Sequence, residues 1–310
     1  MEPIFLEPVY KHHVWGGYKI SKDLKKCDEK QISESWEIAD NANGSTIIKN
    51  GEFRGMFFND LIKDESTKVN VFGTNCENID KFPLLIKFID AKENLSVQVH
   101  PDDLFARNYE NDSGKTELWH IIDCDENAKI ICGLKNNIDV DENNVLENLE
   151  YIPIKKGDSI LIEPGTIHAI MGNTLLCEIQ QNSDLTYRVY DWGRNNPQRP
   201  LHLDKARKVI NKERKGKKIE QKNDINKIEN ISHNNFFYVD KLKVQGSYMF
   251  DSDEKTFKAI NVISGKGTLK YNSMEYSINQ GDSFIIPANL GKYTIDGDLE
   301  ILISYIGEKK

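Results

Sequence analysis

The side chains with the clearest capacity for chemistry lie in residues 95–120 and at one histidine further along the chain. Gln98 and His100 are two residues apart in the alternating segment LSVQVH, so both should point to the same face of a predicted strand. Glu117 stands in a second alternating segment, KTELWHII, and His168 follows the turn EPGT at the head of a third. If the first two strands pair, the carboxylate of Glu117 would face Gln98 and His100.

Two imidazoles, one carboxylate and one amide oxygen form a ligand set that suits a divalent metal. Zinc accepts such nitrogen and oxygen donors, and a catalytic zinc keeps one position open for water or substrate. Manganese, iron and nickel accept the same types of ligand. Because a single strand histidine is more often structural than a ligand, the spacing alone leaves both readings open. His120 is three residues from Glu117 and therefore on the opposite face of the strand, so we exclude it from the site.

Three cations stand near these segments. Lys87 interrupts the apolar strand candidate PLLIKFID, where a lysine either extends to the surface or faces a polar cavity. Arg188 and Arg194 lie in SDLTYRVYDWGR, and a guanidinium matches phosphate or carboxylate oxygens in bidentate fashion. The alternative is that both arginines pair with the aspartates of the same segment, Asp184 and Asp191.

The other elements follow from the same patterns. Trp15 precedes two glycines, which predicts a tight turn where the backbone approaches another group closely; Trp15 itself is either a core residue or part of a site. Residues 35–39 alternate as a strand, and residues 57–72 have an apolar helical face. We expect further helices to start at the acidic pair 102–103 and to cover 139–149 and 204–210.

Composition limits the class of protein. The chain has 310 residues, 38% of them hydrophobic, which is enough for a full core in one large or two moderate domains. A net charge of −8 spread along the sequence argues against a general nucleic-acid partner. No apolar run is long enough for a membrane span, and the first residues lack the layout of a signal peptide. Five cysteines without a CxxC pair fit reduced thiols in the cytoplasm.

The last third of the chain contains an internal repeat. The segment GDSFIIP, at 281–287, resembles GDSILIEP at 157–164, but no histidine follows its proline. Many short strands with Gly, Pro and Asn turns predict a mostly-β fold of two cupin-like jelly-roll barrels, with a small helical insertion in the first. The Lys-, Glu- and Asn-rich stretch before the repeat reads as a solvated connection. We therefore expect a metal-binding domain at 1–212, a charged linker at 213–232 and a domain without metal ligands at 233–310.

Five motifs in this order give the chain a clear resemblance: WGG at 15–17, LSVQVHPDD at 95–103, GKTELWH at 114–120, PGTIHAI at 164–170 and SDLTYRVYDWGR at 183–194. Together they resemble type I mannose-6-phosphate isomerases, and most closely the compact bacterial form with two cupins. The resemblance is specific from about residue 3 to 210 and general beyond. It implies a metal-dependent aldose–ketose isomerase of carbohydrate metabolism that interconverts mannose 6-phosphate and fructose 6-phosphate through a cis-enediol.

The resemblance also implies roles for single residues. One zinc ion per chain would be held by Gln98, His100, Glu117 and His168. Arg188 matches the essential arginine of the family, and Lys115 and Glu178 match its motif lysine and an acidic residue ten positions before the arginine. Trp15 would contact the substrate.

Some roles stay open at this point. The phosphate contact is left among Arg188, Arg194 and Lys87, since this chain has an arginine at 194 where a lysine can occur. The base is left among Glu178, Lys115 and a metal-bound hydroxide. We expect a sugar phosphate as the partner, no nucleic acid or membrane, and a monomer or homodimer. An iron-dependent oxygenase, a sugar-sensing cupin and a storage cupin are the rival classes.

Overall fold

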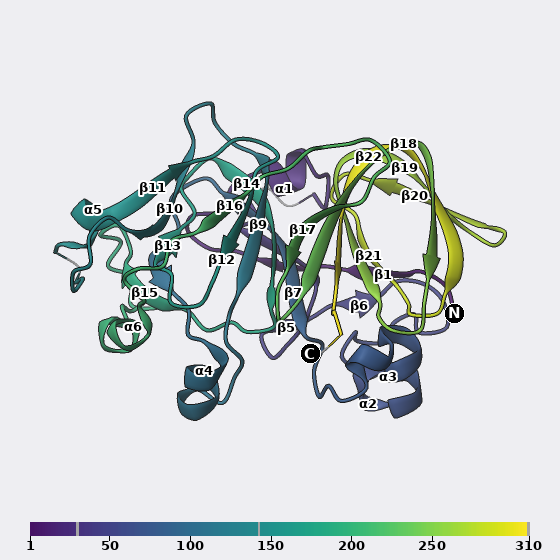
Figure 1. Ribbon diagram of the computed structural model, residues 1–310, viewed down its shortest axis with the longest axis horizontal. Helices are drawn as coiled ribbons and strands as arrows, with labels where there is room; N and C mark the ends of the chain where they lie inside the picture. The colour runs from purple at the N-terminus through teal and green to yellow at the C-terminus, as the bar shows by residue number, and fades with distance from the viewer. Residues whose placement is uncertain (29–30, 142, 309–310) are drawn as a thin grey trace.

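The computed structural model describes residues 1–28, 31–141 and 143–308, and it is built mainly from antiparallel strands (Figure 1). Two β-rich halves lie side by side. The half at the left of Figure 1 contains the segments predicted to hold the metal, and the half at the right contains the long strands near the C-terminus. The prediction of a mostly-β protein is therefore confirmed.

The site-bearing half consists of two sheets. The larger has the order β16-β12-β9-β14-β7-β3-β2, with bounds Lys217–Ile219, Ser159–Ile162, Glu117–Asp123, Thr174–Gln181, Leu84–Ala91, Glu34–Ile38 and Val9–Lys11. The smaller has the order β11-β10-β13-β8-β15, with bounds Leu149–Pro153, Lys129–Leu134, His168–Ala169, Val97–Val99 and Tyr187–Tyr190. A hairpin of β4 (Asp40–Asn41) and β5 (Gly44–Ser45) follows β3.

The two sheets of this half share an apolar interior. One buried cluster joins Ile89, Trp119 and Leu176 of the larger sheet to Ile130 of the smaller sheet. A second cluster, which includes Val97, lies on the smaller sheet. Sheets that bury one face against each other leave the ends of their strands free to carry polar groups. The predicted metal ligands lie at such strand ends.

The second half is organised around three long strands, β18 (Tyr238–Ser252), β19 (Lys258–Tyr271) and β22 (Gly291–Tyr305). Its sheet has the order β17-β18-β22-β19-β21-β1-β6, and β20 also pairs with β19; the remaining bounds are Glu229–His233 for β17, Ser283–Ile286 for β21, Ile4–Glu7 for β1, Ile47–Ile48 for β6 and Met274–Asn279 for β20. Its interior is a buried apolar cluster that includes Val262, Phe284 and Ile301.

The strand pairing differs in two places from a simple division of the chain into two consecutive domains joined by a linker. The first strand of the chain, β1, pairs with β21 of the C-terminal half, with Ile4 opposite Ile285 (Figure 1). An unpaired strand edge exposes backbone donors and acceptors, so β1 completes the second sheet although it lies far away in sequence. The predicted linker 213–232 contains β16 and the start of β17, each paired to a neighbouring strand, so it is not only a solvated connection. The domain limits themselves stay a prediction.

The repeated Gly-Asp-Ser motif occupies matching positions in the two halves. Ser159 on β12 lies opposite His120 on β9, and Ser283 on β21 lies opposite Asn261 on β19. In both places the serine contacts its partner side chain, at 2.8 Å for His120 Nδ1 and 2.9 Å for Asn261 Nδ2. The sequence repeat thus corresponds to a repeated strand pair.

The helices are short and lie outside the sheets. They are α1 (Lys19–Lys22), α2 (Asp60–Lys63), α3 (Glu65–Phe72), α4 (Asp103–Tyr109), α5 (Val145–Asn148) and α6 (Leu203–Val209), with a 3-10 turn at Thr74–Cys76. The helices expected within 57–72, after 102 and near 204–210 are confirmed; Asp102 caps α4 by accepting a hydrogen bond from the Phe105 amide. The predicted helix at 139–149 is only one turn long, and residue 142 lies outside the described residues. No helix among the described residues is both long and apolar enough to cross a membrane.

Candidate active site

The predicted metal ligands come from both sheets of the first half. Gln98 on β8 lies directly opposite His168 on β13 in the smaller sheet, and His100 follows the end of β8. Glu117 begins β9 in the larger sheet. The condition stated for Glu117, that its strand pairs with β8, is not met: the two strands belong to different sheets, and the carboxylate reaches the imidazoles across the interior between them.

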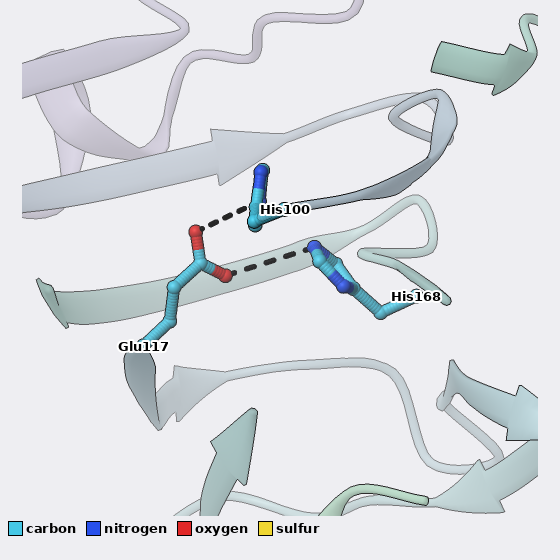
Figure 2. Close-up of side chains that lie close together, drawn as sticks. All are labelled: His100, Glu117 and His168. Carbon is cyan, nitrogen blue, oxygen red and sulfur yellow. Dashed lines mark ion pairs between the residues drawn. The ribbon is translucent and has the colours of Figure 1, made fainter. Parts of the chain in front are cut away.

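Three of the predicted ligands, His100, Glu117 and His168, nevertheless lie close together. His100 Nε2 lies 3.1 Å from Glu117 Oε1, and His168 Nε2 lies 3.7 Å from Glu117 Oε2. Figure 2 shows the carboxylate facing both imidazoles, with one oxygen directed at each. One ligand atom from each residue lies within 4.8 Å of the others, and this is the one group of three such residues found in the part of the chain that the structure describes. The side-chain amide of Gln98 lies at the same place, with Nε2 3.4 Å from His168 Nε2.

Both imidazoles are oriented by hydrogen bonds from their other nitrogen. His100 Nδ1 donates to the Leu185 carbonyl at 2.7 Å, and His168 Nδ1 donates to the Thr166 carbonyl at 2.8 Å. With Nδ1 protonated, each Nε2 presents a lone pair to the cluster, as in metal sites whose histidines are fixed by backbone carbonyls.

Several atoms of the cluster have no hydrogen-bond partner although they are buried. They are His100 Nε2 and both carboxylate oxygens of Glu117. Leaving a buried polar group unpaired costs on the order of 1–3 kcal/mol, and more for a charged group. A divalent cation coordinated by these atoms would remove that cost, and a half-turn of the Gln98 amide would add its oxygen to the set. The residues present therefore fit a metal ion.

The electrostatics of the cluster also favour a metal. Burial, together with Lys115, lowers the pKa of His100 to about 3, so this imidazole is neutral at pH 7 and can act as a ligand. Burial raises the pKa of the Glu117 carboxyl, but Lys115 and His100 hold it well below its usual value. The Lys115 ammonium lies 3.0 Å from Glu117 Oε1, so Lys115 is placed beside the predicted metal ligands.

A cavity of about 370 Å³ opens beside the cluster, a size typical of small-ligand pockets. Gln98, Lys115, Lys87, Glu178 and Arg188 all line it. Trp15 lines it too, and it is at the same time buried in the core cluster of this half. The two readings of Trp15 are therefore compatible with each other.

Lys87 and Glu178 form a buried ion pair in this cavity. They lie opposite each other on β7 and β14, and Lys87 Nζ is 2.8 Å from Glu178 Oε2. Trp119 Nε1 donates to the other oxygen of Glu178 at 3.0 Å. Burial, and then the negative charge of Glu117, raise the pKa of Glu178 to about 7 in spite of Lys87. A carboxyl group with this pKa can both accept and release a proton at neutral pH.

The two predicted arginines are separated. Arg188 on β15 lies opposite Gln98 on β8 and lines the cavity; its buried Nε has no hydrogen-bond partner. Arg194 lies on a different cavity of the same half, where it pairs with Asp191 and Glu93. The alternative that the arginines pair with aspartates of their own segment therefore applies to Arg194, which pairs with Asp191. No ion pair of Arg188 is found among the described residues.

Sequence reasoning missed several residues of the cavity: His13, Glu34, Asp184 and Arg199. Glu34 accepts a hydrogen bond from Trp36 Nε1 at 2.7 Å and lies 3.6 Å from Lys87 Nζ. Its signal was present, because a charged residue in an otherwise buried strand requires a partner. Arg199 lies in a loop and carries no periodic signal.

The turn at the paired glycines brings the backbone close to Asp90, as predicted. A Cβ atom on Gly17 would lie 2.3 Å from Asp90 Oδ1, so any larger residue would displace the Asp90 carboxylate. The Asp90 carboxylate accepts hydrogen bonds from the backbone amides of Lys19 and Ile20, at 2.5 and 3.3 Å. This packing fixes the segment that carries Trp15 against β7.

The fold and the cluster together define a class: a cupin protein with a buried two-histidine, one-carboxylate site beside a ligand-sized cavity. The family models for the phosphomannose isomerase type I catalytic domain and the mannose-6-phosphate isomerase cupin domain match residues 4–135 and 227–306. The probable mannose-6-phosphate isomerase GmuF of Bacillus subtilis is 40% identical over 98% of this chain and 99% of its own, and ManA of the same organism is 34% identical over the same shares. The chain belongs to the type I mannose-6-phosphate isomerase family of isomerases.

Solved structures agree with this assignment. The crystal structure of the mannose 6-phosphate isomerase from Bacillus subtilis has a TM-score of 0.89 to this structure, with 33% sequence identity. The similarity covers 99% of this chain and 100% of that one. The match of the cupin-domain model and the similarity to this structure confirm the predicted cupin fold class.

Proposed function

We propose that this protein interconverts mannose 6-phosphate and fructose 6-phosphate at the cavity beside His100, Glu117 and His168. The observation that carries the proposal is the convergence of these three buried side chains, with ligand atoms that have no hydrogen-bond partner, next to Gln98 and Lys115, which line a cavity rich in charged groups. The names of the relatives given above support the choice of substrate.

We further propose that the cation is one zinc ion, held by Gln98, His100, Glu117 and His168. Zinc suits two neutral imidazoles with a carboxylate and leaves a position open for substrate. When bound, it would supply Lewis-acid stabilisation to the oxygens at C1 and C2 of the sugar. The remaining tasks fall to side chains of the cavity.

An aldose becomes a ketose when a proton leaves C2 and another arrives at C1, with a cis-enediol between the two steps. Glu178 is our candidate for the group that accepts and returns this proton, because it lines the cavity and its pKa lies at about 7. A base of matched pKa contributes ~10²–10⁴-fold. The hydrogen bond from Trp119 and the ion pair with Lys87 hold its carboxyl group in place. Lys115 is the second candidate, since its ammonium also lines the cavity.

Arg188 is placed to stabilise the negative charge that develops during this transfer. It lies next to Gln98 across the β8–β15 pair and has an unpaired Nε. A preorganised cation in a site of low dielectric stabilises a developing oxyanion without reorganisation. Thr186 and Ser96, which also line the cavity, offer hydroxyl groups to the sugar.

The proposal is tested by incubating the purified protein with mannose 6-phosphate and measuring fructose 6-phosphate, before and after removal of bound metal with a chelator. We expect turnover that chelation abolishes and zinc restores. His168→Gln should lose bound zinc and turnover together. His120→Gln is the matched control, because His120 is also buried but contacts Ser159 away from the cluster. Turnover that survives complete metal removal would refute the role of the metal.

The remaining expectations stay proposals. We propose that the chain divides into a metal-binding unit, 1–212, and a C-terminal unit without metal ligands, 233–310. We also propose a cytoplasmic location, which the lack of a CxxC pair or an even number of cysteines in the sequence supports. A monomer or homodimer is expected, and sedimentation measurements would distinguish the two.

A further inference from the structure

One buried carboxylate, Asp191, holds two arginines that have different surroundings. Arg199 binds it in bidentate fashion, with Nε 2.9 Å from Oδ2 and Nη2 3.0 Å from Oδ1. Arg194 binds it through Nη1 at 3.2 Å. The Arg199 side chain is 10% exposed and Asp191 is 7% exposed, so the pair is held in a mostly buried place.

The two arginines differ in what their remaining donors can do. A guanidinium has five N–H donors. Arg194 also uses Nη2, on the Glu93 carboxylate at 3.1 Å and on the Asn94 carbonyl at 2.9 Å. No hydrogen bond of Arg199 other than the two to Asp191 is found for its side chain among the described residues, and Arg199 lines the cavity beside the predicted metal ligands. Arg199 therefore has free donors on a fixed fork, whereas those of Arg194 are used elsewhere.

The charge of the cavity points to an anionic ligand. Five cationic side chains line it against three carboxylates; the cations are Lys11, Lys87, Lys115, Arg188 and Arg199, and the anions are Glu34, Asp184 and Glu178. Lys87 is neutralised by Glu178 at 2.8 Å, and Lys115 contacts Glu117 at 3.0 Å. Arg188 lies beside the metal ligand Gln98. Arg199 differs from these cations in two ways. The carboxylate that orients it, Asp191, does not line the cavity, and its guanidinium keeps N–H donors that a ligand can accept from.

We propose that Arg199, oriented by Asp191, binds the phosphate group of the substrate in bidentate fashion, and that Arg194 does not contact it. The proposal rests on the proposed function for the identity of the substrate. Two parallel N–H donors match two phosphate oxygens, and a fork held by a buried aspartate pays little entropy on binding. Arg199 then decides between sugar phosphates and neutral sugars, while Asp191 acts as a positioning residue.

The loop around Arg199 is built to hold this side chain in place. The Arg199 amide donates to the Asn196 carbonyl at 2.9 Å, which closes a turn, and Pro197 and Pro200 flank it. The His202 amide then donates to the Arg188 carbonyl at 2.7 Å, which ties the loop to β15. The backbone at Arg199 and at Arg188 is therefore held by hydrogen bonds before a ligand binds.

The experiment compares Arg199→Gln with Arg194→Gln, since each variant removes one guanidinium from Asp191 and only the first changes the cavity. Calorimetry measures the Kd of mannose 6-phosphate and of mannose, and inhibition kinetics measure the Ki of inorganic phosphate. For Arg199→Gln we expect the Kd of mannose 6-phosphate and the Ki of phosphate to rise about 10-fold or more, the usual effect of losing a charge-assisted hydrogen bond. The Kd of mannose should stay unchanged. Arg194→Gln should change the phosphate values by less than about 3-fold, because Arg194 lines a different cavity and acts on the phosphate only as a distant, screened charge.

Further measurements keep the outcome clear. Zinc content and urea unfolding are measured for both variants. Arg199→Lys keeps the positive charge but not the two parallel donors of a guanidinium, so its Kd for mannose 6-phosphate and its Ki for phosphate should lie between those of Arg199→Gln and those of the unsubstituted protein. Wild-type phosphate affinity in Arg199→Gln, an equal loss in Arg194→Gln, or an equal loss of mannose affinity would each overturn the proposal. A natural chain that binds mannose 6-phosphate but never converts it would refute the proposed function and leave the Arg199 comparison valid.

Discussion

The Lys87–Glu178 pair offers a prediction that does not depend on turnover. We consider Lys87→Met, which keeps the aliphatic stem and removes the ammonium. Lys87 is 4% exposed and lies 2.8 Å from Glu178 and 3.6 Å from Glu34, so its removal leaves two buried carboxylates without their cation. Breaking a buried ion pair on one side costs ~3–5 kcal/mol. We expect the free energy of unfolding to fall by an amount of that order.

The loss should depend on pH. Glu178 has a pKa of about 7 in the folded protein against an ordinary value of 4.5, so the folded state holds a proton that the unfolded state has released between these values. Its contribution to stability is present below pH 4.5 and is lost as pH rises through about 7, which amounts to about 3 kcal/mol. Without Lys87 this pKa rises further. The cost of Lys87→Met should therefore be larger at pH 8.5 than at pH 5.5, by roughly 1 kcal/mol or more.

Urea unfolding at the two pH values measures this effect, and Glu178→Gln completes a double-mutant cycle. The double variant Lys87→Met, Glu178→Gln should recover at least half of the loss at pH 8.5, because no charge at position 178 then lacks a partner. A loss below about 1 kcal/mol, an equal loss at both pH values, or no recovery in the double variant would refute the reasoning.

Three further predictions concern activity and packing. Turnover should rise with pH through about 7, since Glu178 must be ionised to accept a proton. This rise should be absent from the pH–rate profile of Glu178→Gln. If the rise persists in that variant, another group is responsible for it. Arg188→Ala should lower kcat far more than it raises KM, with partial recovery in Arg188→Lys, and an unchanged kcat would remove Arg188 from the chemistry. Gly17→Ala should lower the free energy of unfolding by ~1–3 kcal/mol, because its Cβ would lie 2.3 Å from Asp90 Oδ1. Gly44→Ala, whose Cβ would lie 3.1 Å from the nearest side-chain atom, should cost less in urea unfolding, and equal losses would contradict this account.

Local pattern was sufficient for the elements that carry the site. Alternation around Gln98 and Glu117 predicted β8 and β9, and the turn before His168 predicted the start of β13. The Asp102 cap and the apolar face of 57–72 predicted helices that the structure contains. These features depend on neighbours a few residues away, so they can be read from short stretches of sequence.

Pairing between strands could not be read in the same way. The sequence does not distinguish a Glu117 strand next to β8 from one on the facing sheet, because an alternating strand fits either place. The structure assigns it to the facing sheet and so makes the cluster a bridge between sheets. The pairing of β1 with β21 likewise joins Ile4 to Ile285 across most of the chain.

The sequence by itself determined the candidate metal ligands, the strands that bear them and the repeated Gly-Asp-Ser unit, since each is a property of a short segment. Only the tertiary structure decided that Arg199 lines the cavity while Arg194 lies outside it, and that Glu178 is opposite Lys87. The physical reason is that the surroundings of a charge depend on which distant strands and loops close around it. The burial and the partners that set its pKa and its free donors therefore appear only once the sheets have packed.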